Sequence, residues 1–143
     1  MPWTFYNASG QQLRSTATVL ATQAEMEAGS SIAAFVTPGR TQYHPGVAKV
    51  WCKWESVGAH SIDASLNVAS VSDGGQAGDT DLLWTTDFST VEYAIITSAD
   101  AGQYSYSRET TQVVGGTTIE SKTDAGTLQD SSGMMCACFG DFA

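Results

Sequence analysis

The sequence has little positive charge. Six lysine and arginine residues stand against fifteen aspartate and glutamate residues, so the formal net charge of the 143-residue chain is −9 at pH 7. A chain with this charge is repelled by phosphate backbones and by anionic membrane surfaces, so we expect no nucleic-acid partner. The acidic residues are scattered without a run of five, which is typical of a solvated surface and not of an acidic tail.

Long hydrophobic runs are also missing. No run of 18 apolar residues occurs, and the opening "MPWTFYNASGQQLRS" lacks the basic start and apolar core of a secretory signal. We therefore expect no membrane insertion, and synthesis in the cytosol. Because that compartment is reducing and the three cysteines are an odd number, a disulfide framework is not expected.

The cysteines themselves fit a hydrophobic core. Cys136 and Cys138 form a C-x-C pattern that places both thiols on one strand face with Met134, and free cysteine is among the most buried residue types. A zinc site would need a second pair of ligands, which Cys52 alone cannot supply. Clustering of the three thiols around a symmetry axis stays open as an alternative.

Groups that carry chemistry are few. The only histidines, His44 and His60, stand beside turn-forming residues, and no HxH, HxxxH, HExxH or G-x-S-x-G motif is present. We predict no catalytic residue, no cofactor and no metal, and a protein that is not an enzyme. Two alternatives stay open: a small glycan hydrolase, for which no carboxylate pair stands out, and calcium in the loop at residues 73–81, whose spacing fits ordinary turn chemistry better.

What the sequence does contain is a period-two pattern from residue 47 onward. In "VAKVWCKWE" the apolar residues Ala48, Val50, Cys52 and Trp54 point to one face, and Lys49, Trp51, Lys53 and Glu55 point to the other, which predicts a half-buried strand. The stretch "SIDASLNVAS" predicts a second strand. Further candidate strands are "STVEYAIITS", "YSYSRETTQVV", "TTIESK" and "GMMCACFG". Six to eight short strands about ten residues apart indicate an antiparallel sandwich or barrel. No βαβ alternation and no second helix are expected.

One of these strands carries an aromatic strip. Tyr104, Tyr106 and Arg108 alternate on one face after the polar loop "SADAGQ". An exposed strip of this kind suits sugar stacking or protein contact. Ordinary cross-strand pairing is the alternative interpretation.

The segment before the strands predicts one short helix. Thr22 and Glu25 form a capping box, and Gly29 is a natural end, so the helix has about two turns. An isolated helix of that length is not stable in water. The apolar residues around it lack a bulky partner within the segment, and either copies of the chain or the following domain would have to cover them: Met26, Ile32, Phe35 and Val36.

The stretch "ATQAEMEAGSSIAAFVTPGRTQYHPGVAKVW" resembles a linker of bacteriophage tail-fibre and related virion fibre proteins, in which T-Q-A-E-x-x-A-G leads to V-T-P-x-x and a receptor-facing domain. The segments "SLNVASVSDGG" and "DLLWTTDFSTVEYAII" resemble the small β-domain that ends many such fibres. The resemblance covers about Thr22 to Ser98, with a weaker similarity in "CACFGDF". The chain is much shorter than the larger fibres and lacks a long shaft.

The resemblance implies a homotrimeric virion protein, made in the host cytoplasm and displayed on the particle. Residues 1–21 would form an arm that docks on another virion protein through Trp3, Phe5 and Tyr6, and residues 22–46 would form the trimer joint. Residues 47–143 would form a mainly β, jelly-roll-like antiparallel sandwich that binds a host-surface glycan or protein. The expected receptor-facing residues come from two exposed segments: Asp73, Asp79, Asp81, Tyr104, Tyr106 and Arg108. A capsid head-fibre or decoration protein with a mainly structural role is the alternative.

Overall fold

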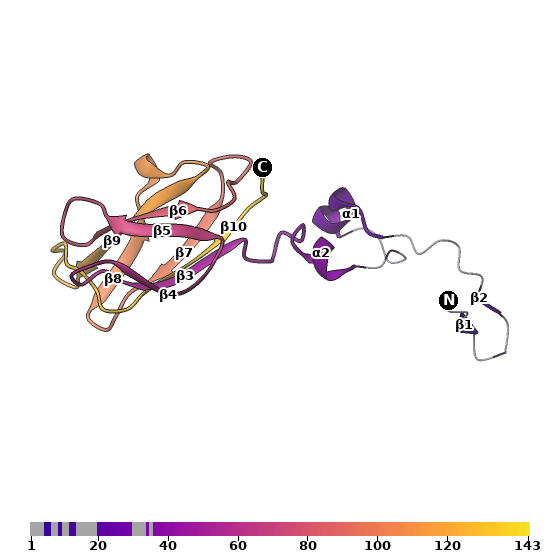
Figure 1. Ribbon diagram of the computed structural model, residues 1–143, viewed down its shortest axis with the longest axis horizontal. Helices are drawn as coiled ribbons and strands as arrows, with labels where there is room; N and C mark the ends of the chain where they lie inside the picture. The colour runs from indigo at the N-terminus through magenta and orange to yellow at the C-terminus, as the bar shows by residue number, and fades with distance from the viewer. Residues whose placement is uncertain (1–4, 7–8, 10–11, 14–19, 30–33, 35) are drawn as a thin grey trace. The chain divides into compact units, whose positions relative to one another are not determined.

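The computed structural model describes residues 5–6, 9, 12–13, 20–29, 34 and 36–143. The chain divides into two compact units, Met1–His44 and Pro45–Ala143 (Figure 1). Trp3, Ile32 and Phe35, which the sequence assigns to the anchor and the joint, lie outside the described residues. Within the described part of the chain, every helix is too short or too polar to cross a membrane.

The first unit contains the expected short helix. Strands β1 (Phe5–Tyr6) and β2 (Gln12–Leu13) pair antiparallel, and α1 follows at Gln23–Ala28. The capping box is confirmed: the Glu25 N–H donates to the Thr22 hydroxyl at 3.2 Å, and the Thr22 N–H donates to the Glu25 carboxylate at 2.8 Å. Gly29 ends the helix in the left-handed conformation, at φ 58°, that glycine adopts without steric cost.

A second helical turn was not expected and is present. Helix α2 spans Pro38–Thr41, with Pro38 in the first turn, where the missing N–H of proline removes no helical hydrogen bond. Of the described joint residues, Val36 is 52% exposed, whereas Met26 on α1 is already buried within the single chain.

The second unit is mainly β and consists of two antiparallel four-stranded sheets packed as a sandwich (Figure 1). The first sheet has the order β4-β3-β10-β7, formed by Ser61–Leu66, Val50–Glu55, Met134–Phe139 and Ala94–Ser98. The second sheet has the order β5-β6-β9-β8, formed by Val68–Asp73, Asp79–Trp84, Gly116–Thr123 and Gln103–Ser107. A short 3₁₀ helix, η1, follows β8 at Glu109–Thr111.

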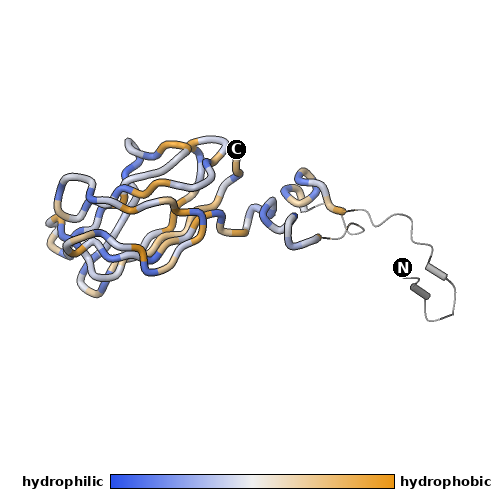
Figure 2. The backbone as a smooth tube through the Cα atoms, viewed as in Figure 1, coloured by the Kyte–Doolittle hydropathy of each residue, from blue (hydrophilic) through white to orange (hydrophobic). Residues whose placement is uncertain are grey.

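The core lies between the inner faces of the two sheets. Strand β3 alternates buried and exposed side chains along its whole length, as the period-two pattern predicted. Trp54 on β3 is fully buried, and its indole N–H donates to the Thr80 hydroxyl of β6 at 3.3 Å, which ties one sheet to the other. Hydrophobic segments of the backbone trace gather along the strands of this unit (Figure 2). The buried apolar residues form one cluster: Val50, Cys52, Trp54, Leu82, Trp84, Phe88, Tyr93, Ile119, Met134, Cys136 and Cys138.

The three cysteines lie in this core, which confirms their interpretation as core residues. Cys52 on β3 faces Cys136 on β10, and all three thiols are free and buried. Burial, with the neighbouring Cys136, raises the pKa of the Cys52 thiol to about 12, so this thiol stays protonated at neutral pH. Because the thiolate is the nucleophilic form, the raised pKa lowers the reactivity of Cys52, which agrees with its place in the core.

The prediction of one strand over residues 61–70 is wrong. The chain bends at Asn67, and β4 pairs in the first sheet while β5 pairs in the second. Asn67 has φ 58°, a left-handed conformation that asparagine tolerates better than most residues. Its side chain holds the corner by accepting from the Thr86 N–H at 2.7 Å and donating to the Thr86 carbonyl at 2.9 Å. The expected strand over residues 104–114 is likewise shorter, since β8 ends at Ser107.

This corner gives a testable order of stabilities. Asn67→Gly keeps the backbone free to adopt positive φ but loses both side-chain hydrogen bonds, which costs about 1–2 kcal/mol. Asn67→Ala loses the same bonds and also places a Cβ in the left-handed region, which costs about 1 kcal/mol more. Denaturant unfolding should therefore rank wild type above Asn67→Gly and Asn67→Ala last. An alanine variant as stable as the glycine variant would contradict the role of positive φ.

Candidate functional site

Most of the expected receptor-facing residues lie on one surface, the outer face of the β5-β6-β9-β8 sheet. Cross-strand register places Asp79, Glu120 and Tyr106 in one row, and Tyr104 opposite Lys122 in the next. We call this surface the tyrosine face and define it by eight side chains: Asp79, Asp81, Tyr104, Tyr106, Arg108, Thr118, Glu120 and Lys122. Five of these were expected from the sequence.

The three aspartates of the Gly-rich segment do not all lie in one loop. Asp79 and Asp81 lie on strand β6, whereas the sequence placed them in a turn. Asp73, at the end of β5, accepts a hydrogen bond from the Gly75 N–H at 2.7 Å and so closes the turn to β6. The three aspartates are therefore divided between a turn and a strand, and among the described residues no three His, Cys, Asp or Glu side chains form a group that could hold a metal ion.

Two buried carboxylates and two basic side chains form the centre of the tyrosine face. Asp79 is 1% exposed and Glu120 is 7% exposed. The Arg108 guanidinium bridges them, with its Nη2 3.1 Å from Asp79 Oδ2 and further contacts to Glu120 Oε1. Lys122 Nζ lies 3.3 Å from the second oxygen of Glu120, which also accepts from the Tyr106 hydroxyl. Each buried charge thus has an opposite charge and a hydrogen bond, as burial requires.

The surroundings shift the two carboxyl pKa values in opposite directions. Burial raises the pKa of Asp79; the positive charge of Arg108 opposes this rise and the charge of Glu120 adds to it. For Glu120, burial also favours the neutral form, but hydrogen bonds from Tyr106, Arg108 and Lys122 outweigh it and lower the pKa. The pKa values of Arg108 and Lys122 are raised, first by their hydrogen bonds to Glu120 and to Tyr106, respectively. The cluster is therefore held by three ion pairs: Arg108–Asp79, Arg108–Glu120 and Lys122–Glu120.

Next to this cluster the two tyrosines form an aromatic platform. The Tyr104 and Tyr106 rings stack with centroids 6.4 Å apart and planes 23° apart, and Tyr104 is 44% exposed. Lys122 Nζ lies 4.8 Å from the centre of the Tyr106 ring and donates to its hydroxyl, which restrains the ring from one side. Thr118 donates to Asp81 at 2.6 Å and fixes the neighbouring carboxylate. The arrangement can bind a ligand that offers both an apolar surface and hydroxyl groups.

Sequence reasoning missed Thr118, Glu120 and Lys122. The stretch "TTIESK" was expected to be a strand, and its alternation places Thr118, Glu120 and Lys122 on one side. The sequence alone could not predict which strands flank this one. Strand β9 lies between β6 and β8, and all three come from different parts of the chain.

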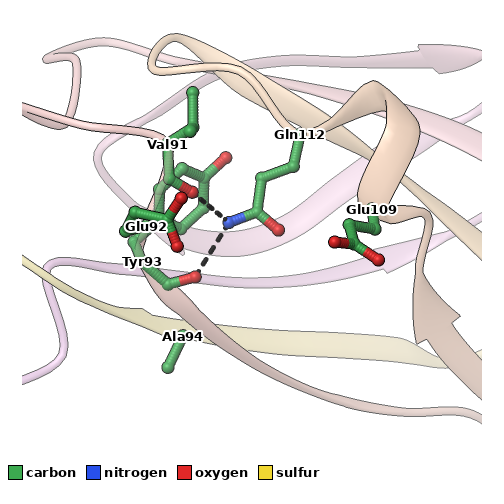
Figure 3. A pocket seen from close by; sticks show the side chains of 6 residues that line it. All are labelled: Val91, Glu92, Tyr93, Ala94, Glu109 and Gln112. Atoms are coloured by element: carbon green, nitrogen blue, oxygen red, sulfur yellow. Dashed lines mark hydrogen bonds between the residues drawn. The ribbon is translucent and has the colours of Figure 1, made fainter.

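Apart from the tyrosine face, a depression lies beside η1 and is lined by Val91, Glu92, Tyr93, Ala94, Glu109 and Gln112. Figure 3 shows the Gln112 amide between two backbone carbonyls, donating to Val91 at 2.7 Å and to Tyr93 at 2.8 Å. The amide thereby ties η1 to the segment before β7. Glu92 and Glu109 project from different segments (Figure 3). This depression contains no histidine or cysteine beside its carboxylates, and His60 lies elsewhere, just before β4.

The ion cluster yields a pH-dependent prediction. Arg108→Met leaves Asp79 and Glu120 buried beside each other without their bridging charge, and should lower the free energy of unfolding at pH 7 by clearly more than the loss of an exposed ion pair does. Without Arg108 both carboxyl pKa values rise, so these groups take up protons as the pH falls and lose their repulsion. The difference between wild type and variant should therefore shrink toward pH 4. Denaturant unfolding at several pH values measures it.

Lys53→Met is the matched control, because the Lys53–Asp63 pair at 2.9 Å is exposed. An exposed pair contributes less than about 1 kcal/mol, so this variant should unfold much like wild type. Equal destabilisation by the two substitutions, or a deficit of Arg108→Met that does not change with pH, would contradict the buried cluster as described.

The chain was compared with protein-family models, with curated proteins and with solved structures. None of the three comparisons found a match. A function for this chain therefore has to be argued from its own residues and from the chemistry that their side chains offer.

Proposed function

We propose that the chain is an attachment protein of a bacteriophage virion, and that its tyrosine face binds a saccharide on the host surface. The observation that supports this proposal most directly is the platform of the exposed Tyr104 and the half-buried Tyr106, beside a set of polar side chains already held in place. Sugar rings present apolar C–H surfaces to aromatic rings and hydroxyl groups to charged and polar side chains.

Preorganisation favours this use of the face. The side chains of Arg108, Glu120 and Lys122 are already locked by mutual contacts, so a ligand does not have to order them. Binding then loses less conformational entropy than it would with mobile side chains. The partly exposed Arg108 and Lys122, at 32% and 25% of their side chains, provide donors at the edge of the platform.

Charge favours a neutral sugar over an acidic one. Asp79 and Glu120 balance Arg108 and Lys122 within the cluster, and Asp81 adds a negative charge beside it. The chain as a whole has a net charge of −9. An anionic saccharide would be repelled by this field, whereas a neutral hexose chain would not.

The other parts of the proposal follow from the resemblance to virion fibres. The N-terminal residues 1–21 attach to another virion protein, and the segment 22–46 joins three copies, which are made in the host cytoplasm and displayed on the particle. Three sugar sites on one trimer raise the overall affinity without new contacts at any single site. Eight strands in two sheets of four agree in number with a jelly-roll-like domain. In this proposal the protein binds its ligand and does not cleave it.

The platform can be tested by removing one ring. Tyr104→Ala deletes the more exposed ring and should weaken binding to neutral glycans by about tenfold, the effect of losing about 1.4 kcal/mol of stacking. Tyr104→Phe keeps the ring and should bind almost as well as wild type. A glycan array probed with the full chain identifies the ligand, and calorimetry on the strongest hit measures the two variants.

Two results would contradict the proposal. One is a folded chain that binds no glycan on the array, which would favour the role of a capsid decoration protein. The other is undiminished glycan binding by Tyr104→Ala, which would place the sugar site away from the tyrosine face.

A further inference from the structure

The outer face of the other sheet, β4-β3-β10-β7, is apolar and exposed. Four large side chains project from its four strands, and two alanines lie between them. We call this surface the apolar face and define it by Trp51, Ala64, Leu66, Ile96, Met135 and Ala137. The exposed fractions of the four large side chains are 40% for Trp51, 49% for Leu66, 64% for Ile96 and 50% for Met135.

Cross-strand register makes this surface continuous. One row crosses all four strands in the order Leu66, Trp51, Ala137 and Ile96. The adjacent row runs through Ala64, Lys53, Met135 and Ser98. A shallow depression on this surface is lined by the two alanines together with Trp51, Lys53, Met135 and Ile96, among others.

An antiparallel sheet with apolar residues on both faces is normally covered on both faces. Strand β10 has apolar residues on both sides: Met134, Cys136 and Cys138 fill the core, while Met135 and Ala137 point outward and are not covered in the single chain. The tyrosine face, on the β5-β6-β9-β8 sheet, has the usual polar character of an outer face, since it carries the ion cluster. The two outer faces therefore differ in kind, and the apolar face has the composition of an interface.

The distribution of charge indicates what covers it. The four strands of this sheet carry three charged residues, Lys53, Glu55 and Asp63, and the first and last of these form an ion pair at 2.9 Å. Elsewhere the chain is strongly acidic, so two copies that met through most other surfaces would repel each other. The apolar face avoids this repulsion. Its protruding side chains and its depression lie on the same surface, so the side chains of one copy can enter the depression of a neighbouring copy.

We propose that the apolar face packs against a second copy of this chain. The inference rests on the proposed assembly of several copies. Strand spacing gives the face an area on the order of 300 Å² per copy, which is less than the ~800 Å² per partner of a standard interface. The face is therefore suited to domains that are already held close together by another segment, since tethering replaces part of the affinity with effective concentration.

Hydroxyl-radical labelling of the full chain, read by mass spectrometry, tests whether the face is covered. At a concentration where sedimentation shows assembled chains, Met135 and Trp51 should be labelled at least about fivefold more slowly than after dilution to single chains. Val57 and Val113, which are 56% and 52% exposed and lie outside the face, should react equally in both states. Ile96→Lys should restore labelling of Met135 at the higher concentration, while Val57→Lys should not.

Each other outcome overturns the inference. Met135 that is labelled rapidly in assembled chains means that copies meet elsewhere, and a chain that stays monomeric with Met135 reactive means that no copy covers the face. Protection that persists after dilution to single chains assigns the face to a segment of the same chain. Sugar binding is a separate readout, because the tyrosine face lies on the other sheet: loss of either property leaves the other intact.

Discussion

The packing of the two sheets around Trp54 is the constraint on which the rest of the domain depends. The indole is fully buried, and its one polar group is satisfied by Thr80 on the facing sheet, so the distance and the register between the sheets are fixed together. Small side chains then have to fill the space beside the large ring. Cys52, Cys136 and Cys138, all free and buried, belong to the same cluster as Trp54 and serve as such small packing side chains.

With the inner faces committed to this core, the two outer faces are free to differ. One presents aromatic rings and a balanced ion cluster, and the other presents aliphatic and indole surface with little charge. Buried ion pairs contribute little net stability, because desolvation offsets much of their attraction. Their presence on the tyrosine face therefore agrees better with a need for fixed positions of polar groups than with a need for stability.

The sequence predicted those features that depend on nearby residues. The alternation of β3, the burial of Cys136 and Cys138 and the capping box of Thr22 and Glu25 all follow from side-chain periods or from contacts three residues apart. The corner at Asn67 was not predictable in this way. Alternating apolar residues continue through it, and what divides the two strands is one positive φ angle together with hydrogen bonds to Thr86, which lies 19 residues away.

The candidate site shows the same limit at longer range. Tyr104, Tyr106 and Arg108 could be placed on one face because they are two residues apart in the sequence, although β8 ends just before Arg108. The carboxylates that hold Arg108, however, come from β6 and β9. Spacing within a strand tells which side chains share a surface, whereas strand order decides which charges meet on it. Strand order here results from the turn at Asn67 and from the insertion of β9 between β6 and β8. The chemistry of the tyrosine face therefore depends on topology, which the sequence pattern did not reveal.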